Sequence, residues 1–103
     1  PMDRVVEVVD FEAVMRQRME DDRELLSDAA RVLYGEDGRA GVAKGMGSAY
    51  ADAVFHRALD ARTWNAVARE MYMAQSTVIR LYDAAMDYVD SAGLDGATRG
   101  DSL

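Results

Sequence analysis

The chain has 103 residues, of which 50% are apolar and 30% are charged, a composition typical of one globular domain. It contains no cysteine, which excludes disulfides, thiolate metal sites and a cysteine nucleophile and favours a reducing cytoplasm as its location. The formal net charge of −7 weighs against nucleic-acid binding, because that binding draws much of its affinity from basic side chains at phosphates. No apolar run approaches the roughly 20 residues of a membrane span, so no membrane association is expected.

Residues 1–9 form a lead-in whose structure the sequence leaves open. The valine-rich run over residues 5–9 fits either a frayed strand or the start of a helix. From Asp10 to Leu33, apolar residues recur at three- and four-residue spacing, which predicts a long amphipathic helix. Gly35 predicts the end of this helix and the start of a loop. No heptad run or internal repeat is evident, and the acidic cluster within the helix is interpreted as a solvated face.

A second helix is expected over about residues 40–59, and its first half is rich in glycine. Gly41, Gly45 and Gly47 each weaken a helix interior by roughly 1 kcal/mol relative to alanine. Two explanations remain open: another helix packs closely here, which we favour, or the first two turns are partly unwound. The region lacks the residue order and the preceding strand of a phosphate-binding loop.

Two further helical patterns follow, separated by about three residues. Thr63 is predicted to cap a helix over residues 64–71, and a fourth helix is expected from about Gln75 until Gly93 ends it. This spacing is typical of a helix-turn-helix. Residues 93–103 are small, polar and glycine-rich, and they are predicted to form a disordered tail. The sequence thus predicts an all-α fold, in which one small four-helix domain over residues 10–92 carries a C-terminal helix-turn-helix at about 63–91.

The helix-turn-helix interpretation depends on a few packing positions. Ala68 is the small residue expected where the second helix crosses the first, and Val78 and Leu81 are the apolar residues expected to hold the two helices together. The second helix then turns six residues away from the core: Gln75, Ser76, Thr77, Ile79, Arg80 and Asp83. Its N-terminal end is the part that reaches base edges in a major groove.

Several of these exposed residues have suitable chemistry for DNA contact. Gln75 can bind an adenine edge, and Arg80 can bind a guanine or a phosphate. Ser76 and Thr77 suit phosphate contacts near a helix N-terminus. Over half of the excess negative charge lies in the N-terminal third, whereas residues 57–90 carry five acidic and four basic residues. The second half of the chain is therefore near neutral.

A family resemblance is carried by the same region. The pattern T-W-x-x-V-A-x-E-M, followed by S-T-V-I-R-L-Y-D-A-A-M-D, resembles the C-terminal helix-turn-helix of ArpU-type, sigma-factor region-four-like regulators of phages and prophages. The stretches R-V-L-Y-G-E-D-G-R-A-G-V-A-K and S-A-Y-A-D-A-V-F-H-R-A-L are also similar to prophage proteins, so the resemblance covers about residues 31–92. It implies DNA recognition by Gln75, Ser76, Thr77 and Arg80, and it allows contact with RNA polymerase.

Two residues depart from the family pattern. Tyr72 stands at the turn position where glycine is preferred, because a left-handed backbone strains a bulky residue. Ala74 replaces the serine that usually caps the second helix, a loss of about 1 kcal/mol. Either the turn is distorted, or Ser76 caps a helix that starts later.

Other functions find less support. Arg80 could form an ion pair with Asp83 or Glu70 instead of contacting DNA. His56 and Asp52 stand at i, i+4 spacing, but a lone histidine in a chain without cysteine indicates a structural role rather than a metal or acid–base site. We therefore expect no enzyme activity, no metal and no cofactor.

The sequence favours a prophage-type transcription regulator that binds double-stranded DNA with the second helix of its helix-turn-helix. The alternative is a protein-interaction module of the same fold without DNA binding, such as an RNA polymerase-binding or phage packaging adaptor. The first helix is expected either to pack on the others or to form a homodimer, which would let two recognition helices engage two half-sites.

Overall fold

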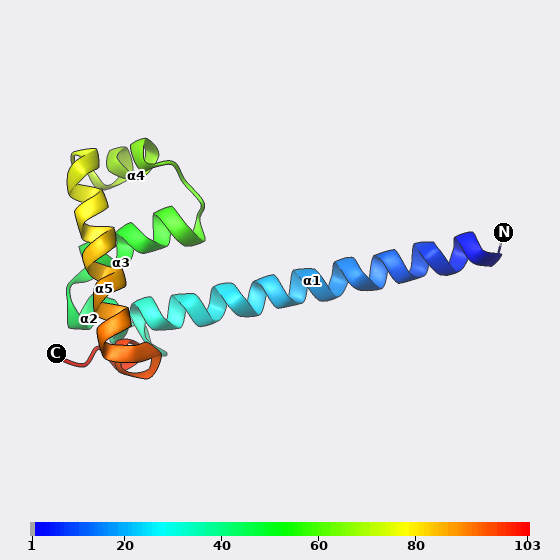
Figure 1. The fold of residues 1–103 in the computed structure, drawn as a ribbon, viewed down its shortest axis with the longest axis horizontal. Coiled ribbons are helices and arrows are strands. Elements are labelled where there is room, and N and C mark those ends of the chain that lie inside the picture. Colours follow the sequence, from blue (N-terminus) through cyan, green and yellow to red (C-terminus); the bar gives the residue numbers. More distant parts are fainter. Residues whose placement is uncertain (1) are drawn as a thin grey trace.

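The computed structural model describes residues 2–103, which form a helical body and a first helix that projects from it (Figure 1). The elements in chain order are α1 (Met2–Tyr34), α2 (Gly41–Gly45), α3 (Ser48–Val54), the π-helical segment η1 (Phe55–Leu59), α4 (Trp64–Met71) and α5 (Gln75–Arg99). The described residues contain no strand, so the all-α prediction is confirmed. None of their helices is long and apolar enough to cross a membrane.

Helix α1 is longer than expected, and only its C-terminal end packs on the body. It begins at Met2, so the valine-rich run is helical rather than extended. It ends at Tyr34, and the Gly35 N–H donates to the Arg31 carbonyl at 2.7 Å, in agreement with the predicted stop. Leu33 is buried in the main core, whereas every side chain described over residues 13–28 is exposed. The expected packing of helix one on the body is therefore limited to its last turns.

The helix predicted over residues 40–59 is divided into α2, α3 and η1. The break lies at Gly47, whose φ of +128° does not fit a helix, so α2 and α3 cannot be continuous. Close packing explains the other two glycines. A Cβ atom on Gly41 would lie 2.5 Å from the backbone carbonyl of Leu33, and one on Gly45 would overlap the Tyr88 hydroxyl. Gly41 also has a non-helical φ of +72°, so close packing and a departure from helical geometry both occur in this region.

The main core lies where the end of α1, α2, α3 and α5 meet. Its buried residues are Leu33, Val42, Ala51, Val54, Ala85, Tyr88 and Ala97. Tyr88 of α5 is only 4% exposed within this core, whereas Met86, two residues earlier on the same helix, is 39% exposed.

A polar contact fixes α1 to α3 beside this core. The Tyr34 hydroxyl donates a hydrogen bond to Asp52 Oδ1 at 2.7 Å. Burial, together with this bond to a carboxylate, raises the pKa of the Tyr34 phenol above its ordinary value. Asp52 therefore accepts a hydrogen bond from Tyr34 and not from His56. The His56 Nδ1 atom is buried without a hydrogen-bond partner among the described atoms.

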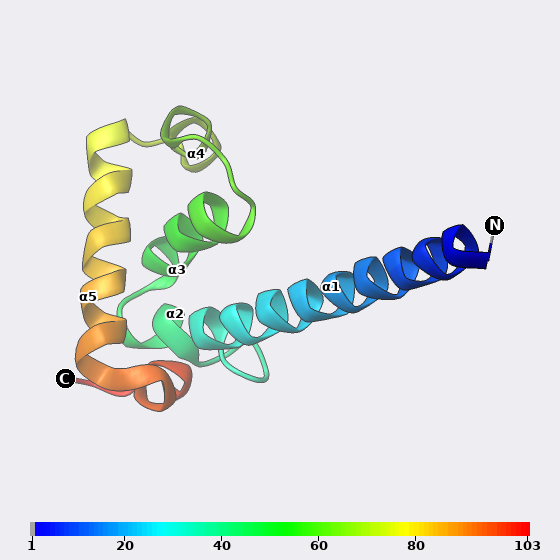
Figure 2. The same ribbon diagram turned by 45° about the vertical axis from the view of Figure 1, so that its right-hand side comes forward.

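The C-terminal segment is ordered against the body, and the prediction of a disordered tail is wrong for most of it. Gly93 has φ 77° and ψ 166° and kinks the helix, but residues 94–99 form a further helical segment. Figure 2 shows this segment turning beside α2 and the end of α1. Ala97 is fully buried, and the Tyr88 hydroxyl donates to the Asp101 carbonyl at 2.6 Å. Small side chains allow this close approach of backbones, so the composition that suggested disorder instead permits tight packing.

Candidate nucleic-acid interface

Helices α4 and α5 form a pair supported by α3. Val67, Ala68 and Val78 are buried together with Ala53 of α3, and Trp64, Met71 and Leu81 pack against them. The packing expected of Ala68, Val78 and Leu81 is therefore observed. Figure 1 shows α4 lying beside the N-terminal end of α5, remote from the point where α1 joins the body. The three residues between α4 and α5 form the turn at this end of the molecule.

The ends of α4 agree with the local signals in the sequence. The Thr63 hydroxyl accepts a hydrogen bond from the Ala66 N–H at 3.2 Å, which is the predicted N-cap. At the other end, Tyr72 has φ 54° and ψ 43°, the left-handed conformation anticipated for the turn. Helix α5 begins at Gln75 with Ala74 as an N-cap that makes no side-chain hydrogen bond. The alternative that Ser76 caps a helix starting later is therefore wrong.

Replacement of Tyr72 by glycine is expected to stabilise the protein by about 0.5–1 kcal/mol. The side chain is 95% exposed, so little packing is lost, whereas a left-handed residue with a Cβ atom is strained by about 1–2 kcal/mol and glycine is not. The midpoint of urea unfolding should rise. The neighbouring Met73→Gly change, at a residue without positive φ, should lower it, and a lower midpoint for both variants would contradict the explanation.

The predicted recognition residues lie together in the first turns of α5. Gln75, Ser76, Thr77 and Arg80 are exposed, as expected. Ile79 is half-buried, so only part of its side chain is available for contact.

Arg80 forms no ion pair with any described residue. Of its two expected partners, Glu70 pairs instead with Arg62, at 3.4 Å. The other, Asp83, forms no ion pair with any arginine in the described part of the chain. The guanidinium of Arg80 is therefore free to meet an external anion.

The other arginines of this end differ in their surroundings. Arg57 lies over the Trp64 ring, 4.6 Å from its centroid, and donates to the Arg62 carbonyl at 2.8 Å. Arg62 is paired with Asp60 at 2.6 Å as well as with Glu70. Arg69, which the sequence analysis did not select, is exposed one turn before Tyr72 and has no ion pair within residues 2–103. Its position beside the turn was the signal that could have identified it.

Charge is distributed unevenly along this half of the chain. Residues 61–82 contain three arginines and one acidic residue, Glu70. The acids Asp83, Asp87 and Asp90 follow further along α5, and all three are exposed. The N-terminal end of α5 is thus basic relative to the rest of the molecule, and it combines this charge with exposed hydroxyl and amide groups. Such a surface suits contact with a polyanion.

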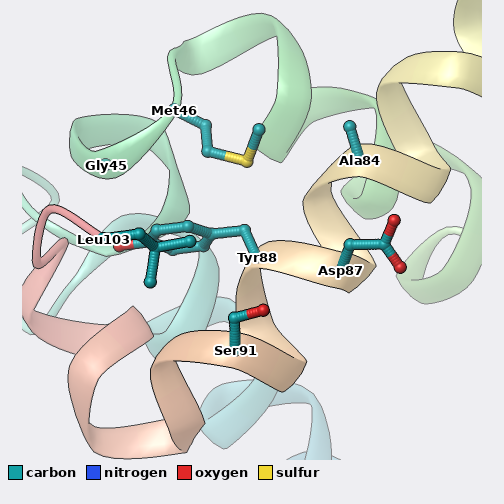
Figure 3. Close-up of a pocket in the computed structure, with 7 residues that line it drawn as sticks. All are labelled: Gly45, Met46, Ala84, Asp87, Tyr88, Ser91 and Leu103. Atoms are coloured by element: carbon teal, nitrogen blue, oxygen red, sulfur yellow. The ribbon is translucent and has the colours of Figure 1, made fainter.

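One hollow of the surface, of about 390 Å³ between α2 and α5, offers no comparable chemistry. It is lined by Gly45, Met46, Ala84, Asp87, Tyr88, Ser91 and Leu103 (Figure 3). Figure 3 shows the Asp87 carboxylate pointing away from the Tyr88 ring, and no second acid or base lines the hollow. The residues that the structure describes also include no cluster of three or more potential metal ligands.

Comparison of the chain with models of protein families, with curated proteins and with solved structures finds no match. A functional conclusion therefore depends on the exposure, charge and geometry of the α4–α5 end.

Proposed function

We propose that this chain is a transcription regulator that binds double-stranded DNA, with α4, the turn and α5 acting as a helix-turn-helix. The observation that carries the proposal is the exposed, polar first part of α5. It begins directly after a three-residue turn and holds Arg80, which has no ion pair with a described residue. In helix-turn-helix proteins the N-terminal residues of the second helix contact base edges in the major groove. The resemblance of this region to ArpU-type prophage regulators supports the same function.

Each exposed residue has a distinct role in this proposal. Gln75 donates to and accepts from an adenine edge, and Arg80 binds a guanine or a phosphate. Ser76 and Thr77 lie in the first turn of α5, whose dipole favours an anion. The Thr77 N–H donates to the Ala74 carbonyl at 3.0 Å, but Ala74 supplies no side-chain cap, so the N–H groups of Gln75 and Ser76 remain available to a phosphate. Arg69 adds a further positive charge beside the turn.

The net charge of −7 does not oppose this function at the proposed contact. Much of the excess lies on α1, whose residues 20–24 include four acids. Figures 1 and 2 show that α1 joins the body beside α2, at the end of α5 remote from α4. Charges separated by more than about 10 Å are largely screened at 0.1 M salt, so the acids of α1 have little effect at the α4–α5 end.

Replacement of Arg80 by alanine is expected to weaken DNA binding by about 1–3 kcal/mol. The measurement is fluorescence anisotropy with pooled random duplexes and duplexes from upstream of the gene, at low and moderate salt. Wild-type binding should also weaken as salt is raised, because phosphate contacts release counterions. The matched control is Arg39→Ala, which removes the same charge from an exposed loop residue. Equal losses for the two variants, or no binding at low salt, would contradict the proposal.

A second candidate function is a protein-interaction module of the same fold that does not bind DNA. The observation that favours it is the turn itself, where Tyr72 is 95% exposed and Met73 is 36% exposed. Tyrosine and methionine are enriched in protein–protein interfaces. A partner such as RNA polymerase or a packaging component would then contact this turn. Failure of DNA binding at low salt, with the protein folded, would move the conclusion to this candidate.

A further inference from the structure

The projecting part of α1 has apolar side chains on which no residue of the described body packs. Val14 is 59% exposed, Leu25 is 68% exposed and Leu26 is 48% exposed. All the side chains described over residues 13–28 are exposed, so this part of the helix receives no tertiary contact from the body. Most helices in proteins are stabilised by packing of an apolar face rather than by helix propensity alone. A partner for this face would supply that packing.

Leu25 lies on one continuous seam along α1, and Val14 and Leu26 flank this seam on its two sides. Successive positions alternate in spacing between four and three residues, which is the spacing of the a and d positions of a coiled coil. These positions are Phe11, Met15, Arg18, Asp22, Leu25, Ala29 and Val32. The last of them, Val32, packs against the main core, so the unpartnered part of the seam ends before it. The two residues at the middle of the seam, Arg18 and Asp22, carry opposite charges. Both are exposed, and neither forms an ion pair with a described residue.

We propose that α1 pairs with α1 of a second copy of this chain, in an antiparallel coiled coil whose two-fold axis passes near residue 20. Facing positions then have numbers that sum to 40, so Arg18 meets Asp22 of the second copy. Position 15 meets position 25, and position 11 meets position 29. Every a position faces a d position, and the two-fold symmetry makes each of these contacts occur twice in the dimer. The seam is therefore complementary to itself in this one register.

Charge complementarity selects the antiparallel orientation. In a parallel, in-register pair, Arg18 would face Arg18 and Asp22 would face Asp22 within a seam from which water is excluded. Like charges in such a position oppose association, and a buried charge without a partner is strongly unfavourable. The antiparallel pair converts both repulsions into ion pairs. A polar pair in an otherwise apolar seam also fixes the register, since a shifted pairing would leave each charge among apolar side chains.

This pairing is independent of DNA binding. The two bodies lie at opposite ends of the paired helices, and the α4–α5 end of each copy stays uncovered because α1 joins the body at the other end of α5 (Figures 1 and 2). The dimer can therefore be tested without any nucleic acid, and its failure would leave the proposed function unchanged.

Sedimentation equilibrium of the full chain over micromolar concentrations tests the proposal. The wild type should reach twice the chain mass of 11.4 kDa. Arg18→Asp should raise the dimer dissociation constant at least about tenfold, because two aspartates then face each other at both ends of the central seam. Combining it with Asp22→Arg should restore the dimer by exchanging the two charges. The matched control, Arg16→Asp, makes the same charge change outside the seam and should leave the dimer intact.

The orientation is tested by cross-linking, which the absence of cysteine makes simple. Met15→Cys and Leu25→Cys chains, mixed and oxidised, should form a disulfide-linked heterodimer. Neither chain alone should cross-link to itself in the antiparallel pair, whereas Leu25→Cys would do so in a parallel one. Circular dichroism confirms that each variant is folded. A monomer at every concentration, a self-linked Leu25→Cys chain, no restoration by the charge exchange, or equal effects of Arg16→Asp and Arg18→Asp would overturn the proposal.

Discussion

Replacement of Gly41 by alanine is expected to destabilise the body by more than about 3 kcal/mol, a large part of the 5–15 kcal/mol that stabilises a typical domain. Two effects combine at this position. Its φ of +72° strains any residue with a Cβ atom by about 1–2 kcal/mol. The added Cβ would also lie 2.5 Å from the carbonyl carbon and oxygen of Leu33 and from the Tyr34 nitrogen. These are backbone atoms of α1, so relief of the contact requires displacement of the whole helix end.

A second glycine separates these two effects. Gly38 has a similar φ of +78°, but a Cβ atom there would meet nothing within 4 Å. Gly38→Ala should therefore lose only about 1 kcal/mol, which is the backbone strain alone. Urea unfolding followed by helical circular dichroism measures both variants. Equal losses at Gly38 and Gly41 would mean that the close approach of α1 to α2 contributes nothing.

The parts of the fold that could be predicted from the sequence are those set by local signals. Thr63 marks the start of α4 with a cap, and the apolar spacing that follows gives both ends of that helix correctly. The division of the second helix could not be predicted, because Gly41, Gly45 and Gly47 have the same local preference. Only contacts made by distant residues distinguish a glycine that packs from one that breaks a helix. The ordered C-terminal segment was missed for the same reason.

In the candidate interface, too, features set by local sequence could be predicted and features set by distant contacts could not. The exposure of Gln75 and Arg80 follows from helical periodicity once Val78 faces inward, so it could be predicted. The free state of Arg80 could not, because it depends on Glu70 pairing with Arg62 across the loop before α4. The α1 seam was also missed, since its two central positions are charged and a count of apolar residues does not register them. Their complementarity emerges only when two copies are considered together.

The second large effect is expected at Tyr88, where α2, α5 and the C-terminal segment meet. Its ring is 4% exposed, and its hydroxyl donates to the Asp101 carbonyl at 2.6 Å. Burial raises the pKa of this phenol, so it is neutral and able to donate near neutral pH. Tyr88→Ala should cost about 3–5 kcal/mol, the range for truncation of a buried aromatic residue. Tyr88→Phe, which removes only the hydrogen bond, should cost about 1 kcal/mol.

A substitution at Gly45 tests the contact between Tyr88 and α2 separately from the rest of the Tyr88 packing. A Cβ atom at Gly45 would overlap the Tyr88 hydroxyl and lie 2.6 Å from the Tyr88 Cζ atom, so Gly45→Ala should be destabilising in the wild type. In the Tyr88→Ala background the obstacle is gone, and alanine is the better helix former by about 1 kcal/mol. The same substitution should then become neutral or stabilising. Urea unfolding of the four proteins gives the coupling energy, and additive effects would show that Tyr88 does not pack on α2. A change of sign would instead make Gly45 the residue that admits the tyrosine, and so the residue that lets the C-terminal segment close over the core.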